Sequence, residues 1–192
     1  MGMLRELRPA LVALLLFTAL CGVAYPLAVT GAAWLVFSKQ STGSMVSEGG
    51  HSLGSDLLGQ ANSDPRDFWP RPSATAKPYD AGSSSGSNLG PSNPALHKAV
   101  KERIAGLRAA DPDNRRMLPI DLVTSSASGL DPHISSEAAY FQAPRVARLR
   151  GVSLEKVDAL VGSLIEGRFL GLFGEPRVNV GRLNRALDRL AQ

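Results

Sequence analysis

The feature that most constrains this chain is a stretch of 30 residues without a charge, between Arg8 and Lys39, which reads "PALVALLLFTALCGVAYPLAVTGAAWLVFS". A helix needs about 20 predominantly apolar residues to cross the hydrocarbon core of a bilayer. The Leu, Val and Phe positions in the stretch together favour insertion by roughly 6 kcal/mol before the polar residues are counted. The sequence therefore predicts a short N-terminus over residues 1–9, one transmembrane helix over 10–37 and a polar domain over 38–192.

Two processed forms compete with a permanent anchor. The apolar region of a cleaved signal peptide usually runs for about 7–15 residues, roughly half of what is present. A lipoprotein site at Cys21 would need a small residue before it, and Leu20 stands there instead. We therefore expect an uncleaved anchor. Because Cys21 is the only cysteine, the sequence predicts no internal disulfide and no thiolate metal cluster.

The flanks of the apolar stretch set its expected orientation. Arg5 and Arg8 precede it, whereas only Lys39 follows it closely, and basic residues favour the cytoplasmic side of a membrane. We expect a cytoplasmic N-terminus, and residues 40–192 on the outer (periplasmic) side of the inner membrane. Pro26 should kink the helix, and a neighbouring helix would best satisfy the carbonyl that it frees.

The polar region is predicted to be an extracytoplasmic, mixed α/β (α+β) domain with a single core. Its first part, up to residue 60, reads either as short strands joined by turns or as a tether. Residues 61–94 are rich in Pro, Gly, Ser and Asn, and we expect an ordered loop that apolar side chains pin to the core. These side chains are Phe68, Trp69, Tyr79 and Leu89.

Regular structure is expected after residue 93. Asn93 and Pro94 predict the N-cap and first turn of a helix. The run "MLPIDLVTSS" predicts a buried strand, and Asp131 with Pro132 predicts the start of a second helix that ends at Gly151. The apolar stripes of these helices are Leu96, Val100, Ile104 and Leu107, followed by Ala138, Phe141, Val146 and Leu149.

The last third of the chain predicts two more helices and a strand. One helix should begin at Ser153 and end near Gly167. The segment "EPRVNVGRLNRALDRL" predicts a short strand and then a helix whose inner face carries Leu183, Leu187 and Leu190. The net charge of +4 is modest, and basic residues alternate with acidic ones along the predicted helices. We therefore expect a solvated face and no nucleic-acid partner.

The segment "SASGLDPHIS" raises the possibility of a hydrolase, because it places Ser126, Ser128, Asp131 and His133 close together. A serine nucleophile usually stands on a strained turn such as G-x-S-x-G, which is absent around these serines. Capping and turn formation are the commoner roles for such residues. The histidines at 51, 97 and 133 show no metal-ligand spacing, so no metal site is expected. The run "GSSSGSNLG" matches no phosphate-binding motif, and we interpret it as a surface loop.

Several motifs in fixed order give the chain a resemblance to a known family. They are "YPLAVTG", "GSDLLGQ", "FWPRPSA", "SGSNLGPSNP", "VTSSASGLDPHIS", "AAYFQAPRVARLRG" and "VNVGRLN". Together they resemble the C subunit of the bacterial potassium-transporting Kdp ATPase over about residues 4–190. Gly181 departs from the family pattern, which has an apolar residue there, and should weaken the start of the last helix. The segment 61–67 departs too, since it is richer in charge and proline.

The resemblance implies a role within a larger complex. Subunits of this family have one transmembrane helix and an extracytoplasmic domain, and they join a channel-like potassium-translocating subunit, a P-type ATPase subunit and a small single-span subunit. ATP and K⁺ are handled by that complex, which implies a non-catalytic subunit in contact with membrane lipid and without a covalently bound cofactor. Its implied role is to assemble and stabilise the complex. The rival hypotheses are a membrane-anchored extracytoplasmic hydrolase and an envelope-binding or scaffold module.

The resemblance also implies candidate site residues. Gln142 would aid ATP binding, although a domain outside the membrane cannot meet cytoplasmic ATP, and we favour the topology argument. Our alternative hypothesis is a rigid cap over the outer mouth of the translocating subunit, where Asp131 biases ion entry. The motif residues expected to shape the domain or to contact partners are Arg71, Ser73, Ser87, Asn88, Asp131, His133 and Arg145.

Overall fold

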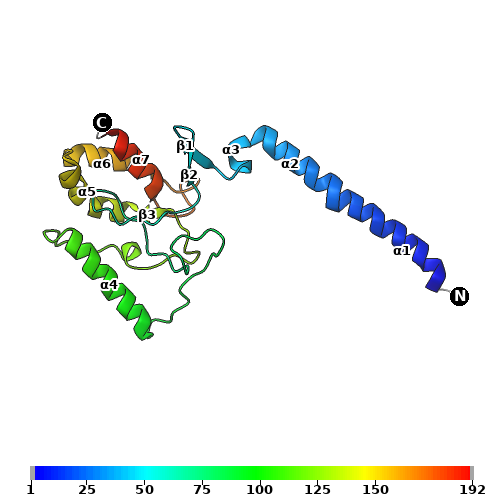
Figure 1. Ribbon diagram of the computed structural model, residues 1–192, viewed down its shortest axis with the longest axis horizontal. Helices are drawn as coiled ribbons and strands as arrows, with labels where there is room; N and C mark the ends of the chain where they lie inside the picture. Colours follow the sequence, from blue (N-terminus) through cyan, green and yellow to red (C-terminus); the bar gives the residue numbers. More distant parts are fainter. Residues whose placement is uncertain (1–2, 191–192) are drawn as a thin grey trace. The chain divides into compact units, whose positions relative to one another are not determined.

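The computed structural model describes residues 3–190 and divides the chain into two compact units at the junction of Ser55 and Asp56. The first unit contains a long helical segment, built from α1 (Met3–Phe17), a π-helical turn (Thr18–Ala24) and α2 (Tyr25–Val36). The short helix α3 (Ser38–Ser41) and the strands β1 (Met45–Glu48) and β2 (His51–Ser55) follow. Figure 1 shows α1 and α2 as one continuous rod.

The helical rod has the length and composition of a membrane span. It covers 32 residues from Arg5 to Val36, and its most apolar 18-residue window has a mean hydropathy of 2.2 with no residue buried within the protein. Large apolar side chains such as Leu15, Trp34 and Leu35 are exposed along it, which is favourable only in an apolar solvent. The predicted single apolar helix is confirmed.

Proline 26 is accommodated without a break in the helix. A proline has no N–H to donate, and its ring collides with the preceding turn of an α-helix. The π-helical turn Thr18–Ala24 ends two residues before Pro26, and prolines and π-turns both interrupt the regular hydrogen-bond pattern of an α-helix. The irregularity that the sequence predicts at Pro26 therefore takes the form of a widened turn.

Residues 45–55 form a β-hairpin, which resolves the choice between strands and a tether. Strands β1 and β2 pair antiparallel, with a register shift between Val46 and Ser47. Gly49 and Gly50 join them with φ angles of 58° and 82°. A two-residue hairpin turn of this hand requires left-handed backbone at both positions, which glycine adopts without strain.

The second unit begins with an irregular segment over 56–93 and continues with mixed helices and strands. Its elements are α4 (Pro94–Ala110), a 3₁₀ turn (Ile120–Leu122), β3 (His133–Ser135), α5 (Ser136–Arg150), α6 (Leu154–Ser163), β4 (Ile165–Glu166), β5 (Arg177–Asn179) and α7 (Val180–Leu190). The three strands form a small antiparallel sheet in the order β3-β5-β4. The mixed α and β architecture is confirmed.

The core lies where α5, α6 and α7 pack together beside the sheet, and α4 lies on the other side of the unit (Figure 1). Its fully buried side chains include Phe68, Leu122, Val146, Val157, Val161, Val178, Leu183 and Leu187. The predicted inner faces of α5 and α7 are largely correct, whereas on the predicted face of α4 only Leu107 is buried. Leu149 and Leu190 are exceptions, because they are 43 % and 39 % exposed at the ends of their helices.

Residues 61–93 of the irregular segment form an ordered loop, as expected, and two of its aromatic side chains enter the core. Phe68 is fully buried and Trp69 is 8 % exposed. The side-chain amide of Asn184 in α7 accepts a hydrogen bond from the Phe68 N–H (2.9 Å) and donates one to the Phe68 carbonyl (3.0 Å). This pair of bonds replaces the strand partner that the segment lacks.

Three sequence predictions about this unit are wrong. "MLPIDLVTSS" forms no strand: Pro119 precedes a 3₁₀ turn, and Met117 and Ile120 are 92 % and 75 % exposed. The second helix begins at Ser136 and not at Asp131, because residues 133–135 are drawn into the sheet by β5. Helix α6 ends at Ser163, before Gly167, because Ile165 and Glu166 pair with the same strand.

Candidate functional site

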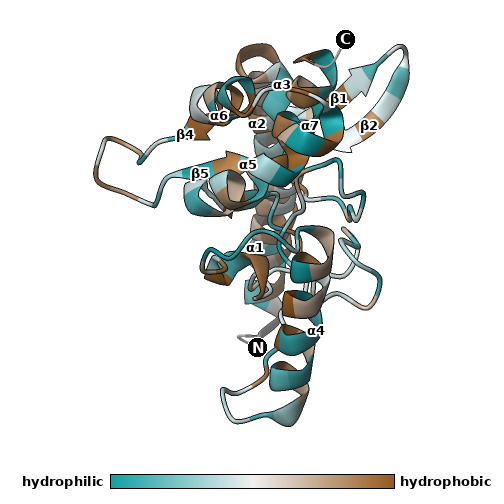
Figure 2. Cartoon of the chain, turned by 90° about the vertical axis from the view of Figure 1, so that its left-hand side faces the viewer, coloured by the Kyte–Doolittle hydropathy of each residue, from teal (hydrophilic) through white to brown (hydrophobic). Residues whose placement is uncertain are grey.

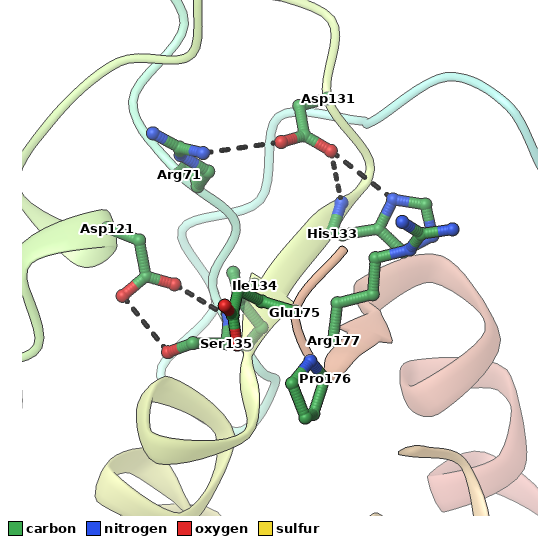
Figure 3. Close-up of a pocket in the computed structure, with 9 residues that line it drawn as sticks. All are labelled: Arg71, Asp121, Asp131, His133, Ile134, Ser135, Glu175, Pro176 and Arg177. Atoms are coloured by element: carbon green, nitrogen blue, oxygen red, sulfur yellow. Dashed lines mark hydrogen bonds and ion pairs between the residues drawn. The ribbon is translucent and has the colours of Figure 1, made fainter. Parts of the chain in front are cut away.

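A pocket of about 330 Å³ opens beside strand β3, at the motif "SGLDPHIS" (Figure 3). Strand β3 and the chain leading into β5 form its walls, and one arginine of the irregular segment reaches into it. The lining residues carry seven charged or polar side chains: Arg71, Asp121, Asp131, His133, Ser135, Glu175 and Arg177, with Ile134 and Pro176 between them.

Asp131 holds the turn that leads into β3. Its Oδ1 accepts a hydrogen bond from the His133 N–H at 3.0 Å, and its Oδ2 lies 3.3 Å from Nη1 of Arg71. Burial raises the pKa of the Asp131 carboxyl, but hydrogen bonds from His133 and the charge of Arg71 outweigh burial, so the pKa lies below its usual value. The predicted role of Asp131 as a helix cap is wrong. The same local bond forms an Asx turn ahead of a strand.

His133 lies between two carboxylates. Its Nδ1 is 3.3 Å from Oδ1 of Asp131, and its Nε2 is 3.5 Å from Oε2 of Glu166 in β4. Glu166 in turn contacts Arg177 at 3.3 Å and Arg182 at 3.1 Å. The imidazole therefore connects the turn at Asp131 to the opposite edge of the sheet.

The chain of charges continues from the sheet into the start of the second unit. Arg182 and Arg185 of α7 both contact the carboxylate of Asp56, at 3.1 Å and 2.6 Å. The Asp56 side chain is only 5 % exposed. Burial raises its pKa, but the bonds from the two arginines outweigh burial and lower the pKa below its usual value. Residue 56 is thereby fixed to the last helix.

Asp121 fixes the start of α5 on the other side of the pocket. Its carboxylate accepts hydrogen bonds from the Ser135 N–H (2.7 Å) and the Ser135 hydroxyl (3.2 Å). The Ser135 Oγ accepts in turn from the Ala138 N–H at 3.0 Å, as an N-cap does. The exposed 3₁₀ turn that carries Asp121 is thus held in place by a polar contact.

Arg71 and Ser73 tie the motif "RPSA" to the neighbouring loops. Arg71 donates to the carbonyls of Thr124 (3.5 Å) and Ser125 (3.3 Å), and Ser73 donates to the carbonyl of Gly129 (2.7 Å). The Tyr79 hydroxyl donates to the Arg71 carbonyl at 2.7 Å. Burial, followed by the nearby charge of Asp131, raises the pKa of Tyr79 to about 12.

Gln142 and Arg145 belong to a separate, buried cluster around Trp69. The Gln142 Oε1 accepts from the Trp69 N–H (2.8 Å) and from Arg145 (2.9 Å), and its Nε2 donates to the carbonyls of Trp69 (3.1 Å) and Ala138 (3.3 Å). A primary amide has two donors and two acceptor positions, so the hydrogen-bonding capacity of Gln142 is fully used. Its exposed fraction is 1 %.

Arg145 and Arg103 complete this cluster from α5 and α4. Their guanidinium groups lie 4.8 Å and 5.4 Å from the centroid of the Trp69 ring, within the range of cation–π contact. Arg145 donates to the carbonyls of Pro65 and Asp67, and Arg103 donates to the carbonyl of Pro70. Burial lowers the pKa of Arg145 to about 10.

Ser87 and Asn88 lie apart from both groups, on an exposed loop. Asn88 has a φ of 51°, a left-handed conformation that asparagine tolerates better than most residues. The beginning of this loop packs on the serine-rich turn, where the Ser85 N–H donates to the Ser128 carbonyl at 3.0 Å. Gly129 permits this close approach, because a Cβ there would lie 2.6 Å from the Ser85 carbonyl oxygen.

The sequence-predicted residues therefore fall into three groups. Arg71, Asp131 and His133 meet at the pocket, and Ser73 lies outside it, where it bonds to the Gly129 carbonyl. Gln142 and Arg145 meet at Trp69, and Ser87 and Asn88 stay on the surface. Sequence reasoning missed several residues that complete the first group. The spacing of three between Arg182 and Arg185, on the helix face opposite the leucines, was an available signal. The residues missed are Asp56, Asp121, Glu166, Arg177, Arg182 and Arg185.

The serines of the motif "SASGLDPHIS" serve as turn caps. Ser126 Oγ accepts from the Gly129 N–H at 3.0 Å, and Ser128 Oγ accepts from the Leu130 N–H at 3.1 Å. Within residues 3–190, no hydrogen bond joins either serine to His133, whose ring faces the two carboxylates. The geometry gives the hydrolase alternative no support.

Comparison with known proteins finds a matching protein-family model and relatives of similar length. A protein-family model described as "K+-transporting ATPase, c chain" matches residues 7–189. The potassium-transporting ATPase KdpC subunit of Variovorax paradoxus is 60 % identical over 186 residues, which are 96 % of this chain and 96 % of that relative. The KdpC subunit of Methylococcus capsulatus is 56 % identical over 189 residues, which are 98 % of this chain and all of that relative.

Replacement of the buried amide should destabilise the second unit. In Gln142→Met the side chain keeps its length but leaves main-chain groups of Trp69 without a partner, so the free energy of unfolding should fall by about 1–3 kcal/mol. The measurement is urea unfolding of the full chain in detergent, followed by Trp69 fluorescence with Trp34→Phe. The matched variant Gln40→Met, at an exposed position of α3, should change stability by less than about 0.5 kcal/mol. Equal stability of the two variants would contradict this role.

The lowered pKa of Asp131 makes a pH-dependent contribution to stability. A depressed folded-state pKa stabilises the fold above the unfolded-state pKa, about 3.9, and this stabilisation is lost as pH falls through the folded-state value. Asp131→Asn keeps the acceptor for the His133 N–H but removes the charge. We expect it to unfold more easily than the parent near pH 7, with the difference shrinking as the pH falls below about 4 and vanishing only below the lowered folded-state pKa. A difference that does not change with pH in the same urea titration would show that the charge is irrelevant.

Proposed function

The chain belongs to the KdpC family of potassium-transporting ATPase subunits, and we propose that within such a complex it acts as a non-catalytic accessory subunit that holds the assembly together. The family match and the relatives at 56–60 % identity over nearly the full length support membership of the family. The geometry of the second unit supports the accessory role.

The observation that carries this proposal is the way in which motif side chains are used. Gln142, Arg71 and Ser73 bond to main-chain groups of distant segments, and Asp131 is paired with Arg71 and His133. A catalytic group must keep its reactive atoms open to substrate. Side chains that are committed to the fold instead make a rigid body, which suits a subunit whose task is to present a fixed surface to partners.

The partners that we propose are the potassium-translocating subunit, the P-type ATPase subunit and the small single-span subunit. The helix from Arg5 to Val36 supplies the membrane contact. Packing between helices in lipid is favoured by small residues and by irregular backbone that a neighbour can satisfy. The π-turn at Thr18–Ala24 and the Pro26 that follows it therefore form the part of the span that best suits a neighbouring helix.

For Gln142 we propose a packing role in place of nucleotide contact. All four hydrogen-bonding positions of its amide are occupied, and contact with ATP would require the Trp69 main chain to move away. For Asp131 the paired charge supports a positioning role over direct attraction of ions, because Arg71 and His133 lie within 3.3 Å of it. ATP and K⁺ are then handled by the other subunits.

The orientation that we propose places the N-terminus in the cytoplasm and the second unit outside. Arg5 and Arg8, which precede the uncharged stretch 9–38, outnumber the single Lys39 that follows it closely, which is the charge bias of an N-terminus that stays inside.

Co-purification tests the accessory role. We expect a tagged chain that is co-expressed with the other subunits to retain them in mild detergent, and the complex to hydrolyse ATP in response to potassium. The chain by itself should hydrolyse neither ATP nor a generic ester. Turnover by the isolated chain, or its isolation without companions from a membrane that contains all subunits, would rule out the proposal.

Thiol labelling in intact cells tests the orientation. With Cys21→Ala as background, Ser83→Cys in the exposed loop should react with a membrane-impermeant maleimide, because the loop is expected outside. Glu6→Cys, on the N-terminal side of the uncharged stretch 9–38, should react only after lysis. The reverse pattern would place the second unit in the cytoplasm and restore the possibility that it meets ATP.

A further inference from the structure

The turn between β4 and β5 exposes an unusual amount of apolar surface. We call residues 169–173, with the sequence "FLGLF", the apolar tip. Phe169, Leu170, Leu172 and Phe173 are exposed to 71 %, 75 %, 75 % and 64 %. Figure 2 shows the segment between β4 and β5 extending away from the strands, with brown residues at its far end. Four large apolar side chains that gather on one projecting turn mark an interaction site more often than an accident of sequence.

The stability of the folded unit does not explain the sequence of the apolar tip. Leu170 has a φ of 52°, a left-handed conformation that suits glycine or asparagine and is unfavourable for leucine. Its side chain is three-quarters exposed, so the folded unit gains little burial in return. The leucine is therefore explained only by something outside the chain that covers it.

The backbone of the tip is prepared for an apolar environment. The Phe169 N–H donates to the Phe173 carbonyl (2.8 Å), and the N–H groups of Leu172 and Phe173 both donate to the Phe169 carbonyl, at 3.1 Å and 3.0 Å. The Gly171 N–H donates to the Arg168 carbonyl at 3.1 Å. Main-chain groups without a partner are the main obstacle to placing a turn in hydrocarbon. Here four of the five amides of the tip, those of residues 169 and 171–173, donate to carbonyls of the tip or of Arg168.

We propose that the apolar tip inserts into the surface of the lipid bilayer, as a second membrane contact of this chain. Lipid is the occupant that the chain already meets, through the span from Arg5 to Val36. Only 19 residues separate Val36 from Asp56. Even fully extended, they reach about 65 Å, so the second unit is tethered within that distance of the end of the span.

The composition of the tip favours lipid over a protein pocket. The large side chains stand on both arms and at the turn, so that only a medium that is apolar on all sides covers them together. The tip has no Trp, Tyr or Arg, the residues that dominate protein–protein contacts. At its base, Arg168 and Glu175 form a neutral ion pair at 2.6 Å, a suitable group for the level of the lipid headgroups.

Fluorescence quenching tests the insertion in the full chain, reconstituted alone into lipid nanodiscs. With Cys21→Ala as background, a nitrobenzoxadiazole label on Leu170→Cys is compared with the same label on Ser83→Cys, on an exposed polar loop. A lipid that carries a nitroxide on its acyl chain should quench the label at 170 at least about threefold more strongly than the label at 83, and aqueous iodide should show the opposite order. Equal quenching at both sites overturns the proposal.

A second variant separates insertion by the tip from insertion by the label. With Phe169→Ser and Phe173→Ser added, the label at 170 should lose its quenching by the lipid nitroxide, and persistence of that quenching overturns the proposal. Unlabelled Leu170→Asn should be at least as stable as the parent, because asparagine tolerates the left-handed conformation. A loss of stability in Leu170→Asn would mean that the leucine serves the fold.

The other subunits provide the remaining outcome. If the label at 170 escapes the lipid quencher in the chain alone and becomes shielded from iodide only in the whole complex, the tip docks on protein and the proposal is wrong. The nanodisc measurement uses the chain by itself, so that its result is independent of the accessory role proposed above.

Discussion

The fold of the second unit depends on a set of side chains that supply the main-chain hydrogen bonds which a neighbouring strand would otherwise supply. The irregular segment 56–93 crosses the core without joining the sheet, and buried backbone groups without hydrogen bonds are costly. Gln142 bonds both main-chain groups of Trp69, and Asn184 bonds both main-chain groups of Phe68. Arginines from α4 and α5 satisfy the carbonyls on either side. With these bonds in place, two aromatic side chains can be buried on a segment that has no secondary structure.

This arrangement explains why the polar motifs of the chain offer little to a small-molecule substrate. A second line of contacts runs from Arg71 through Asp131, His133 and Glu166 to Arg182, and it joins the irregular segment, the sheet and the last helix. In these pairs the charged side chains hold parts of the fold in a fixed arrangement. A rigid body built in this way suits the accessory role that we propose for this potassium-transporting ATPase subunit.

Local signals were reliable wherever a short stretch decides its own structure. The N-cap at Asn93, the left-handed Gly151 after α5 and the glycine pair of the hairpin all stand where their residue types favour them. The failures occurred where a distant segment intervened. Asp131 and Pro132 are a good local start for a helix, yet β5 supplies hydrogen-bond partners that keep residues 133–135 extended. The apolar run after Met117 lacks such a partner and turns instead, because Pro119 interrupts it.

The sequence by itself determined that the chain has one apolar helix long enough to cross a membrane, that a mixed α/β unit follows it, and to which family the chain belongs. These properties depend on composition, on period and on motifs in order, all of which are local or additive along the chain. Only the tertiary structure decided which motif residues meet. It brought His133 between Asp131 and Glu166, closed Gln142 around Trp69 and left the apolar tip uncovered. Contacts of this kind join residues up to 129 positions apart, as between Asp56 and Arg185, and their partners follow from how the helices and the sheet pack, which no local pattern encodes.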